Sequence, residues 1–578
     1  MPRDRLTWVV VPLAVLGLVL TIFWQQQEAA KSRVQAYANQ SVTPAQPSAT
    51  PSSTPLAETA QPVPTPAQPE VPEQTASLKS DVAELQFSNV RGGITRVELL
   101  QHKAEDDHPV VLSNDRAPAI GAISRNPSDW RDSGYALAED QSNGSVTLTK
   151  DIGNSIRVAK TYSIGAPAGV EDPYQLKLSI TFKNTGSAAE DVPGFFVNTG
   201  AAQPMHSNDR STYTTFGWDS EGKFQSINVD WFNPQSFFWV FQTSTGHDIY
   251  SATGAQISWA SVADQYFATV LQSKDKSATQ VWARRDPLSN DPSQRLAFSI
   301  QGALGFPAFT LQPGETKTKE FVIFAGPKEY SRLSKLGDDL NAVVNFGPPF
   351  GFISQLLLTT MNTLHSFVGS YGVAIIIMTL IIRLLLWPVQ NYSMKSMRKM
   401  GQLSPLVNEL KAKYKDDPQR MNQETMKLYK EYNINPITGC LPMLIQIPIF
   451  FGFYAMLGSA VELRDSSFLW VKDLSQPDTV AHLLGFPINI IPLVMAATQL
   501  WQLRITPKTG DASQQRILLI MPVVFLFICY NFASALALYY TVQNLFLIGQ
   551  TYLTRNQAAP QLTKPIKPQT VAKKKSYR

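Results

Sequence analysis

The chain has 578 residues, which is room for several domains, and its formal net charge of +5 is too small to indicate nucleic-acid binding. Its mean hydropathy of −0.10 resembles that of a soluble protein, but the average combines a polar part, up to about residue 345, with a strongly apolar stretch from about 352 to 553. The two cysteines lie in apolar runs, so the sequence offers neither a disulfide framework nor the Cys/His spacing of a metal site.

Residues 1–27 predict an N-terminal transmembrane anchor. Leu6 to Gln27 carries no charge and is long enough to cross about 30 Å of hydrocarbon as a helix. Arg3 and Arg5 before it favour a cytoplasmic N-terminus. The alternative is a cleaved signal peptide, for which Glu28 to Ala30 is a poor cleavage site. Residues 28–79, rich in Pro, Ala and Gln, predict a disordered linker because they cannot bury enough apolar area.

Residues 80–330 predict a large all-β sandwich. In Leu176 to Lys183 apolar and polar residues alternate strictly, as on a half-buried strand. Ser145 to Lys150 and Lys317 to Phe324 follow the same pattern, and turn residues separate these segments. Many short strands with few helices are typical of a sandwich.

Residues 331–369 predict connecting helices followed by an amphipathic helix that lies in the membrane interface, with a true crossing as the alternative. Five apolar segments follow, and with the anchor they make six predicted spans. They cover about 371–389, 437–461, 484–503, 517–532 and 533–553. The core of the bundle, 370–553, therefore contains five helices.

Charge placement gives the predicted topology. The loop 390–436 contains nine Lys and Arg residues and the tail after Leu553 contains seven, whereas the loop 462–483 contains only Arg464 and Lys472. Basic loops stay in the cytoplasm. Both termini, the loop 390–436 and the basic tail 554–578 are therefore predicted to be cytoplasmic, and the β-domain is predicted to lie on the opposite side of the membrane.

Arg383 is the most informative residue because it lies within an apolar span, where an arginine costs roughly 2.5–3.5 kcal/mol. One interpretation is that its side chain reaches the lipid phosphates. The other is a wet groove for polar parts of an incoming polypeptide, lined also by Thr379 one turn earlier. Further polar residues lie in other spans and could instead make helix–helix hydrogen bonds: Gln446, Gln499, Gln543 and Asn544.

The loop 390–436 predicts a helical hairpin, bent or restarted at Pro405 and with Asp417 capping its second arm. Methionines at helical spacing suggest an adaptable surface for hydrophobic clients or partners, or else internal packing of the hairpin: Met394, Met397, Met400 and Met421. The basic tail could contact ribosomal RNA or anionic lipid, or only fix the topology: Lys573, Lys574, Lys575 and Arg578. The sequence contains no phosphate-binding loop of the GxxxxGK[ST] type.

The apolar half resembles a known family. Asn435 to Phe450 (NPITGCLPMLIQIPIF) resembles the third-span signature of the YidC membrane protein insertases, members of the Oxa superfamily. Ile376 to Pro388 and Ala535 to Asn544 (ALALYYTVQN) resemble the second and sixth spans, and Gln515 to Pro522 resembles the start of the fifth. The anchor, linker and β-domain match the Gram-negative form more loosely.

The resemblance implies a five-helix core with a hydrophilic groove open to the cytoplasm and the lipid, in which Arg383 and Thr379 match groove positions. Spans that form the family's client-contacting slide contain Pro448, Phe450, Pro522, Tyr539 and Tyr540. The implied function is insertion of hydrophobic segments into the bilayer, alone or with the Sec translocon and with ribosomes or targeting factors as partners, without catalysis or a cofactor. The outer domain resembles a sugar-mutarotase sandwich. A membrane transporter, or an anchored periplasmic carbohydrate-binding or enzyme domain, are the alternatives.

Overall fold

A computed structural model describes most of the chain between residues 72 and 555. Within that range the description omits 105–107, 114–115, 129–130, 154, 165–171, 206–208, 235, 238–240, 243–245, 289–297, 348, 416, 484–485 and 507–511. The predicted anchor 1–27, most of the linker and nearly all of the basic tail therefore lie outside the described residues. The chain divides into two compact units between Val344 and Asn345, and each is described by itself.

The first unit is a β-domain. Its strands are β1 (Thr75–Lys79), β2 (Ala83–Ser88), β3 (Gly93–Lys103), β4 (Pro109–Leu112), β5 (Ile123–Ser124), β6 (Ala136–Asp140), β7 (Ser145–Ile152), β8 (Ile156–Ser163), β9 (Gln175–Asn184), β10 (Glu190–Val192), β11 (Phe195–Ala202), β12 (Thr215–Ser220), β13 (Lys223–Asn228), β14 (Ser236–Phe237), β15 (Phe241–Gln242), β16 (Ile249–Ala263), β17 (Phe267–Ser273), β18 (Ala278–Pro287), β19 (Phe298–Phe306), β20 (Phe309–Leu311) and β21 (Thr316–Pro327). A short helix, α2 (Tyr330–Lys335), follows the last strand.

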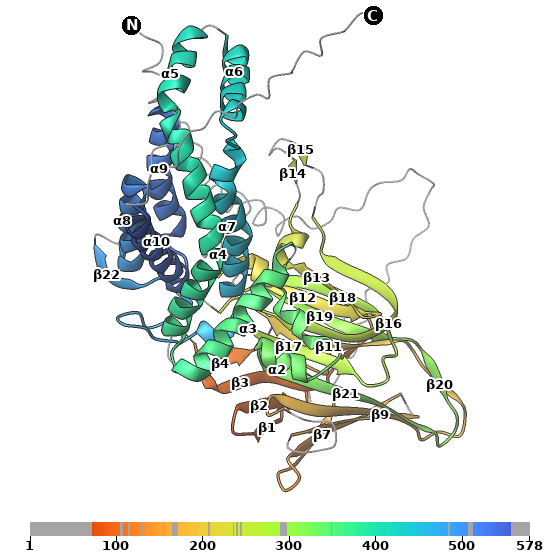
Figure 1. Cartoon of the computed structure of the whole chain (residues 1–578). Helices are drawn as coiled ribbons and strands as arrows, with labels where there is room; N and C mark the ends of the chain where they lie inside the picture. Colours follow the sequence, from red (N-terminus) through yellow and green to blue (C-terminus); the bar gives the residue numbers. More distant parts are fainter. Residues whose placement is uncertain are drawn as a thin grey trace, which may run out of the picture. The chain divides into compact units, whose positions relative to one another are not determined.

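Antiparallel pairing joins 13 of these strands into one sheet, with the order β5-β11-β19-β18-β16-β17-β21-β9-β8-β7-β6 and β12 and β13 branching from β16. The sheet folds back on itself, because β11 contacts β16 and β17, which are not its neighbours in that order. A smaller sheet, β1-β2-β3-β4, contacts β6, β7 and β17. The long strands β9 and β21 run side by side in Figure 1. The prediction of a large all-β domain is confirmed.

The alternation in the sequence sets the register of the core. In β9 the residues Leu176, Leu178, Ile180 and Phe182 are all buried, while Lys177, Ser179 and Thr181 between them are only half-buried. The predicted start of the domain at residue 80 is wrong by a few residues, since β1 lies inside the expected linker. Its Ala76 and Leu78 point inward and its backbone pairs with β2, so this strand buries apolar area that composition alone did not reveal.

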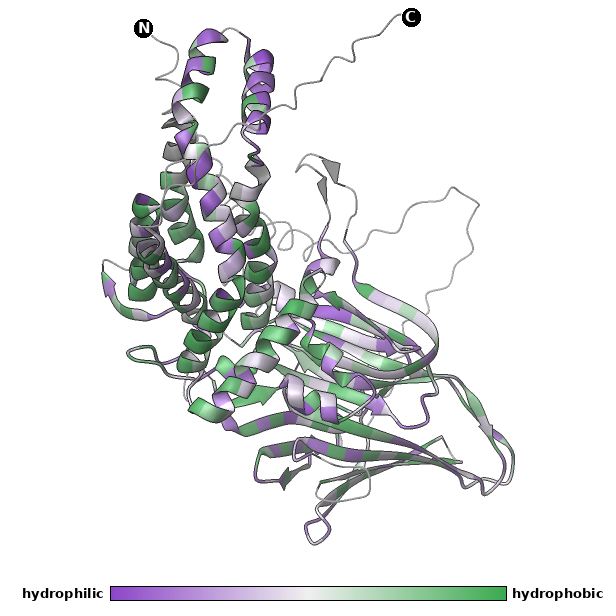
Figure 2. Ribbon diagram, viewed as in Figure 1, coloured by the Kyte–Doolittle hydropathy of each residue, from purple (hydrophilic) through white to green (hydrophobic). Residues whose placement is uncertain are grey.

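The second unit is helical. Its helices are α3 (Gly351–Val368), α4 (Tyr371–Gln402), α5 (Ser404–Lys413), α6 (Pro418–Glu431), α7 (Pro436–Leu457), α8 (Ile490–Ile505), α9 (Ala512–Cys529) and α10 (Ser534–Arg555). Helix α4 packs against α3, α7 and α10, and α10 also packs against α8. Figure 2 shows mostly hydrophobic residues along α8 and α10 and hydrophilic residues on α5 and α6.

Among the described helices, α4 is both long and apolar enough to cross a membrane by itself. Shorter apolar stretches occupy Leu444–Leu457, Ile490–Ile505 and Leu519–Cys529 in α7, α8 and α9. The number of six spans therefore stays a prediction.

One predicted boundary in this unit is wrong, whereas the predicted restart of the hairpin at Pro405 is confirmed. Helix α4 continues through Pro388 to Gln402, and Pro405 occupies the first turn of α5. The span predicted to start at 484 begins at Ile490. The preceding residues form a two-stranded hairpin, β22 (Thr479–Leu483) with β23 (Phe486–Asn489), since Pro487 disfavours helix at the residue before it.

Candidate functional site

The guanidinium of Arg383 lies inside the helical unit, although α4 presents mostly apolar residues around it. The side chain is only 7% exposed, and its Nη2 donates a hydrogen bond of 2.5 Å to Oε1 of Gln446 on α7. Its neighbours in sequence, Leu384 and Leu385, are 59% and 74% exposed. Arg383 therefore points away from the outer surface of the helix and into the contact between helices.

Gln446 extends this contact to α10. Its Nε2 donates to the hydroxyl of Tyr539 and to Oε1 of Gln543, both at 3.2 Å. Tyr539 is fully buried and Gln543 nearly so. Arg383, Gln446, Tyr539 and Gln543 are called the polar cluster below. Three helices that are far apart in sequence thus meet at four polar side chains.

The polar cluster does not neutralise its own charge. Arg383 forms no ion pair with any carboxylate in the described part of the chain, and its buried Nε has no hydrogen-bond partner there. A buried charge without a counterion or a full set of hydrogen bonds is costly. The cluster can therefore accept an anionic or strongly hydrogen-bonding group, and a carboxylate matches the guanidinium best.

Thr379 lies one turn before Arg383 and is fully buried, but its hydroxyl donates to the carbonyl of Ile375 in its own helix at 2.7 Å. Among the described residues, its side chain makes no hydrogen bond to another helix.

Asn544 and Gln499, also predicted to line the groove, lie elsewhere. Nδ2 of Asn544 donates to the carbonyl of Met495 and to the hydroxyl of Thr498, both at 3.3 Å, and so joins α10 to α8. This is the helix–helix hydrogen bond that the sequence had left open. Gln499 is half-buried, with an Oε1 that has no partner among the described residues. The structure does not bring either residue into the polar cluster.

The aromatic residues predicted to contact clients pack against each other. Phe450 of α7 and Tyr540 of α10 have ring centroids 5.9 Å apart, and Phe525 of α9 lies 5.0 Å from Tyr540. Tyr539 stacks on Phe453 at 4.4 Å. These rings tie α7, α9 and α10 together, and in this arrangement Tyr539 and Tyr540 are buried. Of the two prolines, Pro448 is half-buried and Pro522 is buried.

Exposed apolar residues lie on the outer faces of the same helices. On α7, Leu444, Ile447 and Phe451 are 42–48% exposed at positions i, i+3 and i+7, which share one helical face. Helix α9 exposes Phe527 and Ile528. The helical spacing of these three α7 residues is visible in the sequence. Because nearly all residues of α7 are apolar, however, the sequence does not show which of its faces other helices cover.

The predicted methionine surface is only partly present. Met394 is buried, so in this arrangement it offers no surface to a client. Met397, Met400 and Met421 are half-buried. Met426 of α6, which is not among the predicted methionines, is 55% exposed.

The predicted cap of α6 is confirmed. Oδ1 of Asp417 accepts a hydrogen bond of 2.9 Å from the backbone N–H of Arg420. The basic tail residues Lys573, Lys574, Lys575 and Arg578 lie outside the described residues.

Comparison with known families covers both units. A family described as "60Kd inner membrane protein" matches residues 363–561, and one described as "YidC periplasmic domain" matches residues 75–360.

Three individual relatives share the same name. A "Membrane protein insertase YidC" from Pelobacter propionicus is 32% identical over 480 residues, which span 80% of this chain and 83% of the relative. A relative of the same name from Syntrophus aciditrophicus is 40% identical over 306 residues, 53% of each chain. A third, from Citrifermentans bemidjiense, is 30% identical and is covered over 84% of its length.

Similarity to solved structures is weak. A galactose mutarotase related enzyme from Lactobacillus acidophilus superposes with a TM-score of 0.31 at 11% identity, over 44% of this chain and 97% of that one. A likeness of this size carries no argument about activity.

Proposed function

This chain belongs to the YidC family of membrane protein insertases, and we propose that it moves hydrophobic segments of client proteins into the bilayer through a groove centred on Arg383. The observation that supports this site is a buried guanidinium whose hydrogen-bond partner is a glutamine of another helix. Family membership favours this function over a transporter or an anchored carbohydrate-binding or enzyme domain. The family is not one of enzymes.

The polar cluster offers a client a temporary position inside the membrane. An acidic residue that flanks a client's hydrophobic segment exchanges with Gln446 as the partner of Arg383, because a carboxylate forms the stronger, charge-assisted hydrogen bond. Nε2 of Gln446 keeps its two hydrogen bonds, to Tyr539 and Gln543, while Oε1 gives up the guanidinium. The polar part of the client is thereby hydrated or hydrogen-bonded at a depth where isolated polar groups are costly.

The hydrophobic segment of the client leaves along the exposed apolar faces of α7 and α9. Leu444, Ile447 and Phe451 form such a face on α7. Transfer of about 20 apolar residues from water to hydrocarbon supplies the driving force, so no nucleotide or cofactor is part of the proposal. Pro448, Phe450, Pro522, Tyr539 and Tyr540 form the inner wall of this route. Pro448 and Phe450 are half-buried, whereas the other three become accessible only if α7, α9 and α10 separate.

The proposed topology has six spans, with both termini and the α5–α6 hairpin in the cytoplasm and the β-domain in the periplasm. The charge distribution supports it: basic residues are frequent in 390–436 and rare in 462–483. The bundle lies in the inner membrane. Nascent membrane proteins are then the clients, the Sec translocon is a lateral partner, and ribosomes or targeting factors bind the cytoplasmic face, where Met397, Met400, Met421 and the basic tail lie. Gln499, Gln543 and Asn544 provide further polar surface between the helices.

Insertion of a small two-span client tests the proposal in cells depleted of this protein and of any backup pathway. Arg383→Leu should lower insertion of a client with an acidic outer flank at least tenfold. The same client with Asn or Gln in place of those acidic residues should depend much less on Arg383. Lys472→Leu is the matched control, because it removes one exposed positive charge outside the polar cluster.

Two results would contradict the proposal. Unchanged insertion in depleted cells would exclude the insertase function. An equal loss with acidic and neutral flanks would leave the insertase function standing but exclude the carboxylate exchange at Arg383. A photo-crosslinker at Phe451 should capture the hydrophobic segment of the arrested client, whereas one at the buried Ala374 should not.

A further inference from the structure

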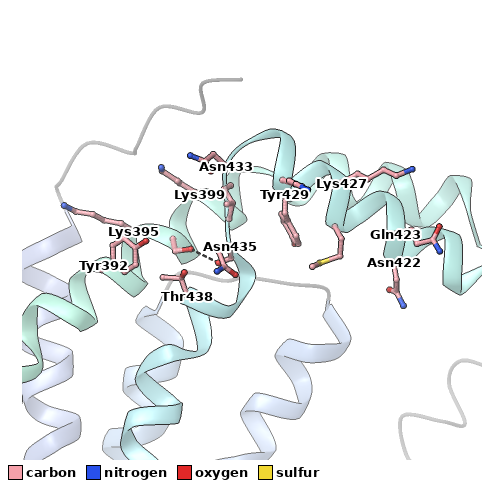
Figure 3. Close-up of a pocket in the computed structure, with 14 residues that line it drawn as sticks. Tyr392, Lys395, Lys399, Asn422, Gln423, Lys427, Tyr429, Asn433, Asn435 and Thr438 are labelled. Atoms are coloured by element: carbon pink, nitrogen blue, oxygen red, sulfur yellow. Dashed lines mark hydrogen bonds between the residues drawn. The ribbon is translucent and has the colours of Figure 1, made fainter. Parts of the chain in front are cut away.

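A large pocket opens beside the hairpin, between the C-terminal half of α4, α6 and the start of α7. Its volume is about 1070 Å³ (Figure 3). Four lysines line it, Lys395 and Lys399 from α4 and Lys427 and Lys430 from α6. No acidic side chain is among the described residues of its wall. The pocket is therefore a concave site of one sign of charge, which focuses the electrostatic potential on an anion.

Three of these lysines have no acidic partner among the residues that the structure describes. Lys427 is paired with Glu424 on the same helix at 2.6 Å. Within the described chain, Lys395, Lys399 and Lys430 have no carboxylate within salt-bridge distance. Three free ammonium groups around one hollow match a ligand with at least one fully ionised group and several acceptor oxygens, as in a phosphodiester.

The rest of the wall is amphipathic. Figure 3 shows the ring of Tyr392 on one side of Asn435 and Thr438 and the ring of Tyr429 on the other. Asn422 and Asn433 add amide groups, and Met426 and Ile434 add apolar surface. Such a wall can hydrogen-bond a glycerol or phosphate group at one end and contact hydrocarbon at the other.

The position of the pocket along α4 matches the headgroup layer. At 1.5 Å per residue, Tyr392 lies about 6 Å beyond Pro388, where the apolar run of α4 ends, and Lys395 lies about 10 Å beyond it. The headgroup layer on each side of a bilayer is roughly 5–8 Å thick. A lysine side chain can reach back over the remaining distance. Thr438, in the first turn of α7, borders the same pocket where the apolar run of that helix starts.

We propose that this pocket binds the headgroup of an anionic phospholipid, with its phosphodiester between Lys395, Lys399 and Lys430. Basic pockets next to transmembrane helices on the cytoplasmic side have the chemistry to hold such headgroups. The position favours lipid over ribonucleic acid, because the pocket borders the apolar runs of α4 and α7 and not the tip of the hairpin. The proposal rests on the cytoplasmic placement of the hairpin given above. A bound lipid would tie α4 and α6 to each other and to the membrane surface.

The test is native mass spectrometry of the detergent-solubilised full chain, titrated separately with dihexanoyl-phosphatidylglycerol, dihexanoyl-phosphatidylcholine, inorganic phosphate and a 20-nucleotide RNA. One basic residue near an anionic lipid changes affinity roughly fivefold. The triple variant K395Q/K399Q/K430Q should therefore bind phosphatidylglycerol more than tenfold more weakly than the wild type. The matched control K411Q/K413Q/K415Q loses the same charge from the far end of the hairpin and should bind like the wild type.

Several results would overturn the assignment. Equal affinities of the triple variant and the wild type would exclude the pocket as the site. Equal affinities for the two lipids would exclude charge selection. If inorganic phosphate displaces the lipid at equal concentration, the ligand of the pocket is a free anion. If RNA binds more tightly than the lipid and the triple variant weakens that binding, the ligand is a nucleic acid. If the wild type binds the lipid but does not insert clients, the proposed function is refuted and this site is not.

Discussion

The hydrogen bond between Arg383 and Gln446 can be measured as a coupling energy. The perturbations are Arg383→Leu, Gln446→Leu and the double variant. A matched pair between α4 and α10 is available at Asn391 and Gln550, where a neutral amide donates to a neutral amide at 3.0 Å. Both pairs join helices of the same unit, so the comparison isolates the effect of the positive charge.

The structure gives the expected magnitudes. A hydrogen bond to a charged group contributes about 1.5–3 kcal/mol, whereas neutral side-chain bonds between membrane helices average about 0.6 kcal/mol. Gln446→Leu removes one bond of the first kind and two of the second, so it should cost about 3–4 kcal/mol. The coupling energy of Arg383 with Gln446 should be about 1.5–3 kcal/mol, several times that of Asn391 with Gln550.

Reversible unfolding in mixed micelles, with the fraction of dodecyl sulfate as the denaturant and tryptophan fluorescence as the signal, yields the four free energies of each cycle. A coupling energy for Arg383 and Gln446 no larger than that of the neutral pair would refute the argument. It would mean that water or lipid satisfies the guanidinium, and that no client carboxylate has to exchange with Gln446.

Three further predictions concern other parts of the chain. Gly452→Ala should destabilise the helical unit by about 1–3 kcal/mol in thermal unfolding, because the new Cβ would lie 2.6 Å from Cγ2 of Ile353, whereas Gly549→Ala, with nothing within 4 Å, should be neutral or slightly stabilising. Asp417→Ala should cost about 1 kcal/mol and speed amide exchange in the first turns of α6. Burial raises the pKa of Asp264 to about 6, so the folded state favours the protonated carboxyl. The stability that this group contributes is therefore lost as the pH rises from 4 through 6. Between pH 4 and pH 7, the free energy of unfolding of Asp264→Asn should rise by roughly 3 kcal/mol relative to that of the wild type, as measured by hydrogen exchange of the slowest amides of β17.

Sequence patterns predicted those parts of the fold that depend on local periodicity. The alternation in Leu176 to Lys183 placed alternate side chains in the core of β9, and Asp417 before Pro418 fixed the start of α6. Both signals arise within one element, so they do not require knowledge of its neighbours. Arg383 was informative for a related reason, because a charged side chain within an apolar span needs a polar partner or water in any fold.

The identity of that partner could not be predicted, because it depends on the packing of three helices. Gln446, Gln499 and Asn544 are similar polar residues in similar apolar contexts, yet only Gln446 bonds to Arg383, while Asn544 bonds to α8. The burial of Met394 has the same origin, because it depends on which face of α4 the neighbouring helices cover.

The partner that the structure gives to Arg383 bears on how a client is both held and released. A buried guanidinium without any partner carries the full desolvation penalty of its charge. A client carboxylate that relieved this penalty would be bound tightly and released slowly. With Gln446 in place, a client gains only the difference between a charge-assisted bond and the bond that it displaces, which is about 1–2 kcal/mol or a factor of roughly 5–30 in affinity. The bonds from Nε2 of Gln446 to Tyr539 and Gln543 are not broken by the exchange, so the displaced amide loses only the bond at its Oε1. In the proposed exchange, a client held this weakly would depart once its apolar segment reaches lipid, so a glutamine beside the arginine would favour turnover over capture.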